Sequence, residues 1–227
     1  MIECLFLDLD DTILDFHGGE QIAIRQTLQK SGLEPTPEVL TAYHRINQWH
    51  WQQLELGKMT RNQVLTGRFQ VLFAEMGIQG DCAACAETFM DELSRCHTFL
   101  PGAENALEGL KKKYRLFLAS NGTASVQHRR IAGAGLEPYF EDIFISQEIG
   151  YNKPNLGYFG CCFARIPGFD PQKAMIVGDS LTSDIQGGIN AGIKTCWVNP
   201  GHAKAPEGLQ PDYEIERLIQ LEELLEE

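Results

Sequence analysis

The chain has 227 residues, of which 43% are hydrophobic and 22% are charged, and its formal net charge is −12. Domains mostly hold roughly 100–200 residues, so this length predicts one catalytic domain with a smaller inserted module. The acidic balance disfavours nucleic acid and anionic membranes as partners, because both are bound by clustered Lys and Arg. Any anionic ligand must therefore be held locally, by a cation or by a few placed donors.

Two features predict a cytoplasmic location. The chain has no run of about 18 apolar residues to cross a bilayer, and residues 1–12 lack the basic flank and apolar length of a secretory signal. Its seven cysteines, an odd number at irregular spacing, favour reduced thiols over a disulfide framework. Cys82 and Cys85 form a C-x-x-C pair with Cys96 and His97 downstream, so a zinc site is an alternative there, but no second such pair supports it.

Residues 2–7 form the first predicted strand, and their mostly apolar character is typical of a strand covered on both faces. The segment Asp8-Leu9-Asp10-Asp11-Thr12 follows at once, at the carboxyl end of the strand, where open parallel sheets bind ligands. The carboxylates of Asp8 and Asp10 repel each other unless a cation or proton lies between them, and Mg²⁺ is the simplest remedy. Taken alone, the segment is equally well explained as a solvated acidic turn.

A helical module is predicted between the first and second strands, which lie about 100 residues apart, far more than an ordinary crossover needs. The module is assigned to residues 18–97, and the core to residues 1–17 and 98–227. Gly18-Gly19 and residues 97–102 are the predicted hinges, because the backbone bends there at little cost. The amphipathic stretches of the module are 21–30, 38–53, 61–76 and 82–96.

After this module, strands and helices alternate. Such alternation predicts an α/β fold with a parallel sheet and right-handed crossovers. Strands are predicted at 114–119, 143–146, 173–177 and 194–198, and helices at 103–113, 123–134, 156–164 and 183–191.

Two of the later strands are followed by groups that can bind an anion. Ser120-Asn121-Gly122 ends the second strand and precedes a helix, so the Ser120 hydroxyl and nearby amides can form an anion site. Lys153, just before Pro154, lies after the third strand, where its ammonium group can reach phosphate oxygens. Each signal is weak alone, because such a tripeptide is often only a turn and a lysine is usually a surface charge.

The fourth strand supplies more carboxylates. Asp179, within Gly178-Asp179-Ser180, is a candidate metal ligand at the same edge of the sheet as Asp8. Asp184 can accept a hydrogen bond from a metal-bound water or from loop amides, and it can also cap the helix that begins near Ser183. Chance would rarely place two acidic clusters at the carboxyl ends of strands in the same sheet, so the sequence predicts a metal-assisted phosphate site.

The order Asp-x-Asp-x-Thr, Ser-Asn-Gly, Lys-Pro, then Gly-Asp-Ser with a later Asp resembles the four motifs of the haloacid dehalogenase (HAD) superfamily. The match spans the whole chain. Residues 100–103, Leu-Pro-Gly-Ala, resemble the re-entry into the core of members that carry a helical cap after the first motif. The resemblance implies a Rossmann-like three-layer core with a parallel sheet of order 3-2-1-4-5 and an inserted α-helical cap that is mobile.

The resemblance also implies a magnesium-dependent phosphatase. Asp8 would attack phosphorus and become an aspartyl-phosphate. Asp10 would protonate the leaving alkoxide and then take a proton from the attacking water. Thr12 would orient Asp10 or its loop.

The same resemblance assigns the binding groups. Mg²⁺ would be held by the Asp8 carboxylate, the Asp10 backbone carbonyl and Asp179. Asp184 would fix the site by accepting hydrogen bonds from a metal-bound water or from loop amides. The phosphoryl oxygens would be held by Ser120, the Asn121 backbone amide and Lys153.

The substrate is predicted from a softer resemblance. Residues 57–61, 66–69, 178–185 and 196–200 are similar to pyrimidine 5'-nucleotidases, which dephosphorylate nucleoside monophosphates. A nucleoside 5'-monophosphate is therefore the predicted substrate, and a small sugar phosphate is the alternative. An aromatic ring of the module can stack on a base, although core packing is the commoner role for such rings. The candidate rings, on one predicted helix, are His44, Trp49, His50 and Trp51.

Three other functions are alternatives to a phosphatase. A phosphomutase would keep every core residue and differ in how the cap handles a phosphorylated intermediate. A haloacid dehalogenase would share Asp8, but members of that branch resemble one another in lacking an acid at the position of Asp10. A phosphate-binding protein without activity would not need the full catalytic set.

Overall fold

The computed structural model describes residues 1–226 and divides into two compact units. Met1–Phe16, together with the chain from His97 onward, forms one, which we call the sheet unit. His17–Cys96 forms the other, which we call the helical unit. No helix within residues 1–226 combines the length and apolar character needed to cross a membrane.

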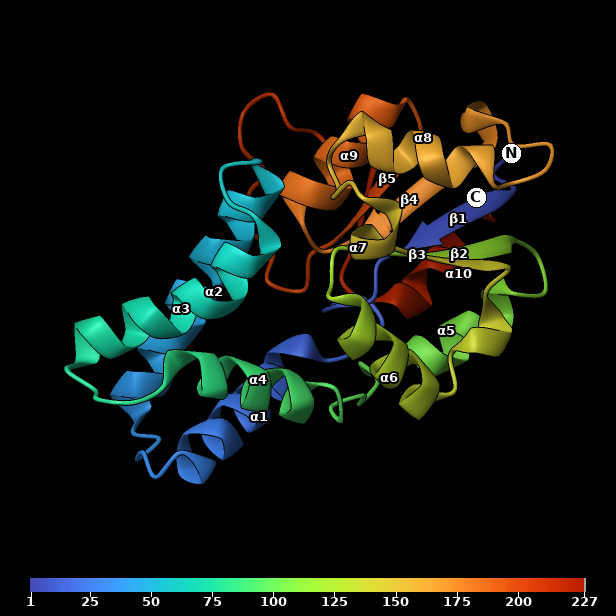
Figure 1. The fold of residues 1–227 in the computed structure, drawn as a ribbon. Coiled ribbons are helices and arrows are strands. Elements are labelled where there is room, and N and C mark those ends of the chain that lie inside the picture. Colours follow the sequence, from blue (N-terminus) through green and yellow to red (C-terminus); the bar gives the residue numbers. More distant parts are fainter. Residues whose placement is uncertain (227) are drawn as a thin grey trace. The chain divides into compact units, whose positions relative to one another are not determined.

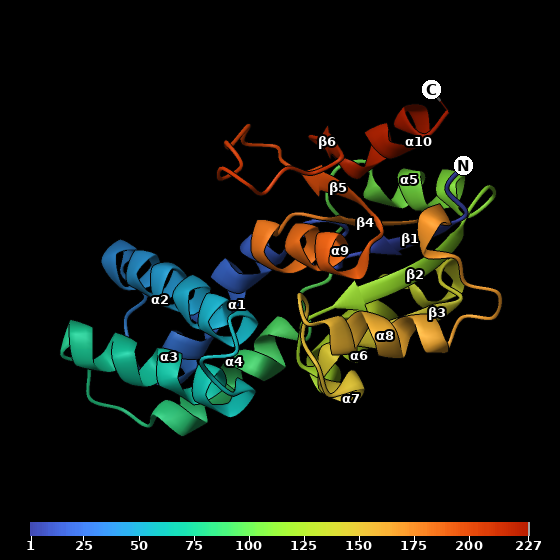
Figure 2. The same cartoon turned by 90° about the horizontal axis from the view of Figure 1, so that it is seen from above.

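A parallel sheet organises the sheet unit (Figures 1 and 2). Over residues 1–226, its strands follow the order β3-β2-β1-β4-β5-β6, so the predicted order 3-2-1-4-5 is confirmed and a further strand extends it beside β5. Strand β6 is not among the predicted strands, because it has three residues, of which only Ile215 is buried. The strands are β1 (Cys4–Leu7), β2 (Arg115–Ser120), β3 (Asp142–Ile145), β4 (Ala174–Gly178), β5 (Lys194–Val198) and β6 (Tyr213–Ile215).

Helices cover both faces of this sheet, which gives three layers. In β1, Leu5 and Leu7 join the cluster under α5 and α6, while Cys4 and Phe6 join the cluster under α8. This alternation explains why β1 is buried throughout. Figure 1 shows α8 and α9 on one side of the sheet and α5 and α6 on the other. The helices of the unit are α5 (Ala103–Leu110), α6 (Ala124–Ala134), α7 (Ser146–Ile149), α8 (Leu156–Ala164), α9 (Gln186–Ala191) and α10 (Leu221–Leu224), with short 3₁₀ turns at Glu137–Tyr139, Pro171–Lys173 and Leu218–Gln220.

The helix predicted at 183–191 is different in the structure. A π-helical turn at Leu181–Ile185 comes first, and α9 begins at Gln186. The wider turn arises because the amides of Asp184 and Ile185 both donate to the carbonyl oxygen of Ser180, at 2.9 and 3.2 Å. Such wide turns occur mostly at functional sites.

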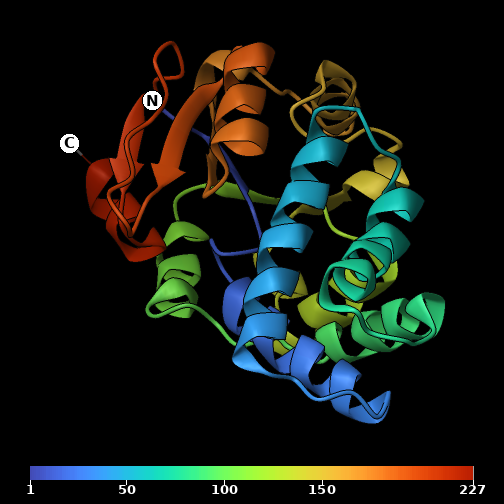
Figure 3. The same cartoon turned by 90° about the vertical axis from the view of Figure 1, so that its left-hand side faces the viewer.

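The helical unit contains α1 (Phe16–Lys30, shared at its first residue with the sheet unit), α2 (Pro37–Glu55), α3 (Arg61–Met76) and α4 (Cys82–Leu93). Figure 3 faces these helices and shows α2 beside α3, against which it packs. Their shared interior holds an aromatic cluster of Tyr43, Phe69 and Phe89, with ring centroids 5.3–6.0 Å apart.

The glycines of the predicted hinge, Gly18 and Gly19, both lie inside α1. A Cβ atom on Gly19 would lie 2.9 Å from Cβ of Cys96. Glycine is therefore needed here for close packing of α1 against the segment after α4.

Candidate active site

The predicted site residues follow neighbouring strands. Asp8 comes directly after β1, Ser120 ends β2 and Asp179 comes directly after β4. Because β1 pairs in parallel with both β2 and β4, the carboxyl ends of these strands meet at one edge of the sheet. The topology thus gathers residues that are far apart in the sequence.

Three carboxylates gather at this edge. One oxygen each from Asp8, Asp179 and Asp184 can be chosen so that all three lie within 4.8 Å of one another. Asp8 and Asp184 are buried, and Asp179 is partly buried. Like charges this close require a compensating cation or a proton.

Lys153 supplies one positive charge to the cluster. Its Nζ donates to Oδ1 of Asp8 at 2.7 Å, to Oδ1 of Asp184 at 2.6 Å and to the Ala119 carbonyl at 2.6 Å. The lysine is only 1% exposed, so it is not the surface charge that a lone lysine usually is. Its three contacts use all three donors of the ammonium group.

The pKa shifts follow from burial and charge. Burial, together with the charges of Asp184 and Asp10, raises the pKa of Asp8 to about 8 despite the neighbouring Lys153. Burial and the charges of Asp8 and Asp184 also raise the pKa of Asp179 well above its usual range. Burial alone would lower the pKa of Lys153, but the two carboxylates that it contacts raise it overall.

These groups fit a divalent cation. When all three carboxylates are ionised, the one ammonium group leaves two negative charges uncompensated in a largely buried cluster. Oxygen ligands of this kind suit a hard ion such as Mg²⁺.

Asp184 is held in place by its surroundings. Its Oδ1 accepts from Lys153, and its Oδ2 accepts from the Ser180 amide at 3.2 Å. A Cβ atom on Gly178 would lie 2.2 Å from Oδ2 of Asp184, so only glycine leaves room for this carboxylate. With both oxygens engaged, Asp184 fits the predicted role of a group that supports the site.

Asp10 points to a different set of partners. Its carboxylate accepts from Nε2 of Gln127, at 2.8 Å, and from the Arg130 guanidinium. Gln127 also donates to Oγ of Ser120 at 2.8 Å, and Arg130 donates to Oε1 of Gln127 at 3.0 Å. A buried chain of hydrogen bonds therefore links the acid of the first motif to the serine of the second.

Gln127 and Arg130 are not among the predicted site residues, although the sequence carries a signal for them. The buried residues of α6 are Val126, Gln127, Arg130 and Ile131, which lie along one stripe at helical spacing. Two polar residues in a buried stripe need partners, and here Asp10 and Ser120 are those partners.

The remaining predicted residues have distinct surroundings. Asn121 fixes the Lys153 backbone through its side chain: Nδ2 donates to the Lys153 carbonyl at 3.0 Å, and Oδ1 accepts from the Lys153 amide at 2.9 Å. Oγ of Ser120 accepts from the Gly122 amide at 3.1 Å. Thr12 is buried, and its Oγ1 has no hydrogen-bond partner within residues 1–226.

Known proteins are similar to this chain in sequence and in fold. The model of the haloacid dehalogenase-like hydrolase family matches residues 5–198. The HAD-hydrolase YfnB of Bacillus subtilis (strain 168) is 38% identical to this chain, covering 97% of it and 94% of YfnB. A crystal structure of YfnB bound to magnesium, which reveals interdomain movement, matches with a TM-score of 0.94 over 99% of this chain and 98% of that one.

Two pyrimidine 5'-nucleotidases are also similar. PynA of Streptococcus pneumoniae (strain ATCC BAA-255 / R6) is 37% identical, over 93% of this chain and 90% of PynA. YjjG of Escherichia coli (strain K12) is 30% identical, over 97% of this chain and 96% of YjjG.

The fold and the site together define a hydrolase built on an open parallel sheet, with its polar groups at the carboxyl ends of the strands. The family match gives this class its name, and it confirms the resemblance seen in the sequence motifs. The chain belongs to the haloacid dehalogenase-like hydrolase family.

Proposed function

We propose that this protein is a magnesium-dependent phosphatase that hydrolyses small phosphate monoesters through an aspartyl-phosphate on Asp8. The observation that carries the proposal is the buried contact of Lys153 with both Asp8 and Asp184. It places a fixed cation directly beside a carboxylate at the edge where ligands bind in such sheets. A phosphate group that approached Asp8 would meet the positive charge it needs.

In this proposal, Asp8, Asp179 and the Asp10 backbone carbonyl hold Mg²⁺, and Asp184 supports them. When bound, the ion neutralises charge shared by the nucleophile and the phosphate. The support for this assignment is the net charge of the carboxylate cluster and its oxygen-only donor set.

The side chains of Asp8 and Asp10 carry out the proposed reaction. An oxygen of Asp8 attacks phosphorus in line while the ester oxygen leaves, and Asp10 gives that oxygen a proton. Asp10 then takes a proton from the water that hydrolyses the aspartyl-phosphate. Gln127 and Arg130 hold the Asp10 carboxylate in a fixed orientation through this exchange.

Three groups are proposed to hold the phosphoryl oxygens: the Ser120 hydroxyl, the Asn121 amide and the Lys153 ammonium group, which would exchange one of its present contacts for a phosphoryl oxygen. The side chain of Asn121 fixes the backbone of Lys153, which supports a rigid arrangement of these donors. Thr12 is proposed to orient Asp10 or its loop, as the motif resemblance implies.

The proposed substrate is a nucleoside 5'-monophosphate with a pyrimidine base. The similarity to PynA and YjjG over more than nine-tenths of this chain supports it. We assign the choice of substrate to the helical unit, which we interpret as the cap. Among the candidate rings of α2, Trp49 is 48% exposed, whereas His50 is buried and bonded to the Ile46 carbonyl, so Trp49 is the better candidate for stacking on a base.

We also propose a cytoplasmic location. Each of the seven cysteines is a free thiol, which suits a reducing compartment.

The test is the release of inorganic phosphate from a panel of phosphate esters, with and without Mg²⁺. Uridine or thymidine monophosphate should exceed simple sugar phosphates in kcat/KM, and omission of Mg²⁺ should remove the activity. The Asp8→Asn protein, purified in the same way, measures background from contaminating phosphatases. A preference for sugar phosphates would contradict the nucleotidase proposal, and the absence of Mg²⁺-dependent release from every ester would contradict phosphatase activity.

A further inference from the structure

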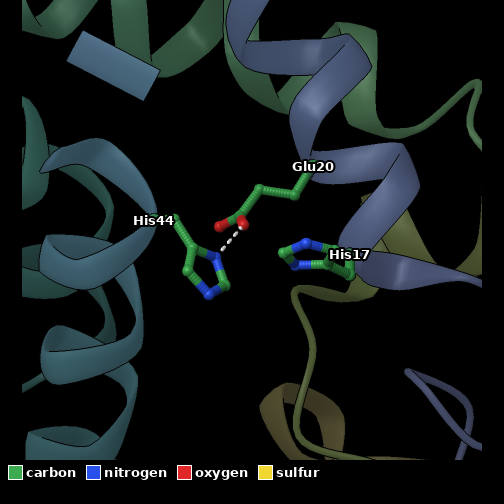
Figure 4. A group of neighbouring side chains, drawn as sticks. All are labelled: His17, Glu20 and His44. Atoms are coloured by element: carbon green, nitrogen blue, oxygen red, sulfur yellow. Dashed lines mark hydrogen bonds and ion pairs between the residues drawn. The ribbon is translucent and has the colours of Figure 1, made fainter. Parts of the chain in front are cut away.

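A second cluster of ionisable side chains lies wholly within the helical unit (Figure 4). His17 and Glu20 come from α1, and His44 comes from α2. One ligand atom from each can be chosen so that all lie within 4.8 Å of one another. Figure 4 shows the three side chains directed into a common space between the two helices.

Helix geometry explains how the cluster forms. His17 and Glu20 are three positions apart on α1, which places them on the same face about one turn apart. His44 lies 24 positions after Glu20, on the facing side of α2. The imidazole rings of His17 and His44 meet edge to face, with centroids 4.7 Å apart.

Glu20 is the fixed member of the cluster. It is only 2% exposed, and its Oε1 accepts from Nδ2 of Asn47 at 2.5 Å. Asn47 in turn accepts from Nη1 of Arg68 at 2.8 Å. These partners hold one oxygen of the carboxylate and turn the other, Oε2, toward Nδ1 of His44 at 2.7 Å.

This pattern of contacts is the one that metal ligands usually have. Carboxylates that bind a metal are themselves hydrogen-bonded by a second layer of residues, which fixes their orientation. Asn47 and Arg68 provide such a layer for Glu20. His17 and His44 are exposed, so an ion can reach the cluster from solvent.

We propose that His17, Glu20 and His44 bind a divalent transition-metal ion, such as Zn²⁺ or Ni²⁺, through two imidazole nitrogens and one carboxylate oxygen. Imidazole ligands select this class of ion over Mg²⁺, which prefers oxygen ligands. The site is thus distinct in chemistry from the carboxylate cluster of the sheet unit. It does not depend on the phosphatase proposal.

The chosen ligand atoms lie within 4.8 Å of one another, so binding requires each pair to move by at most about 1.5 Å. Zinc bonds of about 2.0–2.2 Å at a tetrahedral angle separate ligand atoms by roughly 3.3 Å. Nδ1 of His44 and Oε2 of Glu20 are 2.7 Å apart, so they must open by less than about 1 Å. The ion takes the place of the proton between these two atoms, and in a neutral imidazole that proton moves to Nε2, the ring nitrogen that lacked one.

The test is Zn²⁺ titration by calorimetry on the full chain with saturating Mg²⁺, which occupies the carboxylate cluster first. The wild type should bind one Zn²⁺ per chain at this site. His17→Ala and His44→Ala, which change exposed residues, should each weaken binding by at least about 10-fold, and the double variant should lose it. His128→Ala is the matched control, because His128 also pairs with a carboxylate, Glu148, at 2.8 Å on the surface.

Co²⁺ gives a second readout, since its visible spectrum differs between nitrogen or oxygen ligands and thiolates. The proposal predicts d–d bands that disappear in the His17→Ala/His44→Ala protein, without a thiolate charge-transfer band. Wild-type Zn²⁺ binding that persists unchanged in the double variant, or a thiolate band in its place, would overturn the proposal. So would the absence of any Zn²⁺ binding to the wild type.

Discussion

The two clusters of ionisable residues differ most in how their charges are shielded. In the sheet unit, Asp8, Asp184 and Lys153 are buried, and each contacts an opposite charge from a distant part of the chain. In the cluster of the helical unit, Glu20 is buried, while His17 and His44 are exposed. Water screens the second cluster but not the first, so electrostatic interactions are stronger at the sheet edge.

Substitutions in the two clusters should therefore differ in their cost to stability. At the sheet edge, the loss of one charge leaves another buried and uncompensated, which is costly. In the helical unit, an exposed histidine can be replaced at little structural cost. The largest effects on the protein are therefore expected from changes at the sheet edge.

The largest expected effect is that of Asp8→Asn. The amide has nearly the shape of the carboxylate but is not a nucleophile, so kcat should fall by about 10⁴-fold or more. Steady-state kinetics with the preferred ester measure this loss, and circular dichroism checks that the fold is kept. Glu137→Gln, which changes an exposed carboxyl group in the same way, is the control. Activity near the wild-type level in Asp8→Asn would mean that Asp8 is not the nucleophile.

Much of the sheet unit could be predicted from the sequence, because its strands are short apolar runs between helical segments. The positions of Asp8, Ser120 and Asp179 at one edge follow from this topology alone, since each lies at the end of a parallel strand. The edge strand β6 could not be predicted, because its residues Tyr213 and Glu214 are exposed and give no apolar signal. A strand can thus be predicted from the sequence when its residues are buried and therefore apolar.

Side-chain partners were harder to predict than strand positions. The contact of Arg130 with Asp10 joins residues 120 positions apart, and it depends on how α6 rotates against the sheet. The cluster of His17 with His44 likewise depends on the packing of two helices that the sequence shows only as separate amphipathic stretches. Spacing within one helix is visible in a sequence, but the pairing of two helix faces is not.

The next effect in size concerns Arg130, which holds the proposed acid and base, Asp10, in place. Arg130→Met keeps most of the side-chain volume but removes the charge and the hydrogen bonds. We expect kcat to fall by about 10- to 100-fold with a smaller change in KM, because a misplaced acid slows the chemical step more than substrate binding.

Arg130→Lys keeps the charge and should restore part of the lost kcat. Arg129→Met, at the exposed neighbouring position, should behave like the wild type. Thermal unfolding of each variant shows whether it is folded at the assay temperature. A folded Arg130→Met protein with wild-type kcat would show that this contact does not position Asp10 for catalysis.

The smallest effect is a pH dependence of stabilisation by Mg²⁺. The pKa of Asp8 rises from 3.8 to about 8 in the folded chain. The folded state binds this proton more tightly than the unfolded chain does, so protonation of Asp8 stabilises the fold. This stabilisation is complete below about pH 4 and is lost as the pH rises toward 8. Mg²⁺ displaces protons from the carboxylate cluster when it binds, so protons oppose Mg²⁺ binding less as the pH rises.

The increase in Tm on adding Mg²⁺ should therefore be larger at pH 8 than at pH 5.5, by about 2–4 °C if the difference is about 1 kcal/mol. Differential scanning fluorimetry at fixed ionic strength measures both increases. In Asp8→Asn, the titrating group is gone, so the dependence on pH should shrink. Equal increases at the two pH values in the wild type would indicate that protons and Mg²⁺ do not compete at the sheet edge. The exposed histidines of the helical unit, by contrast, bind Mg²⁺ poorly and should not contribute to this difference.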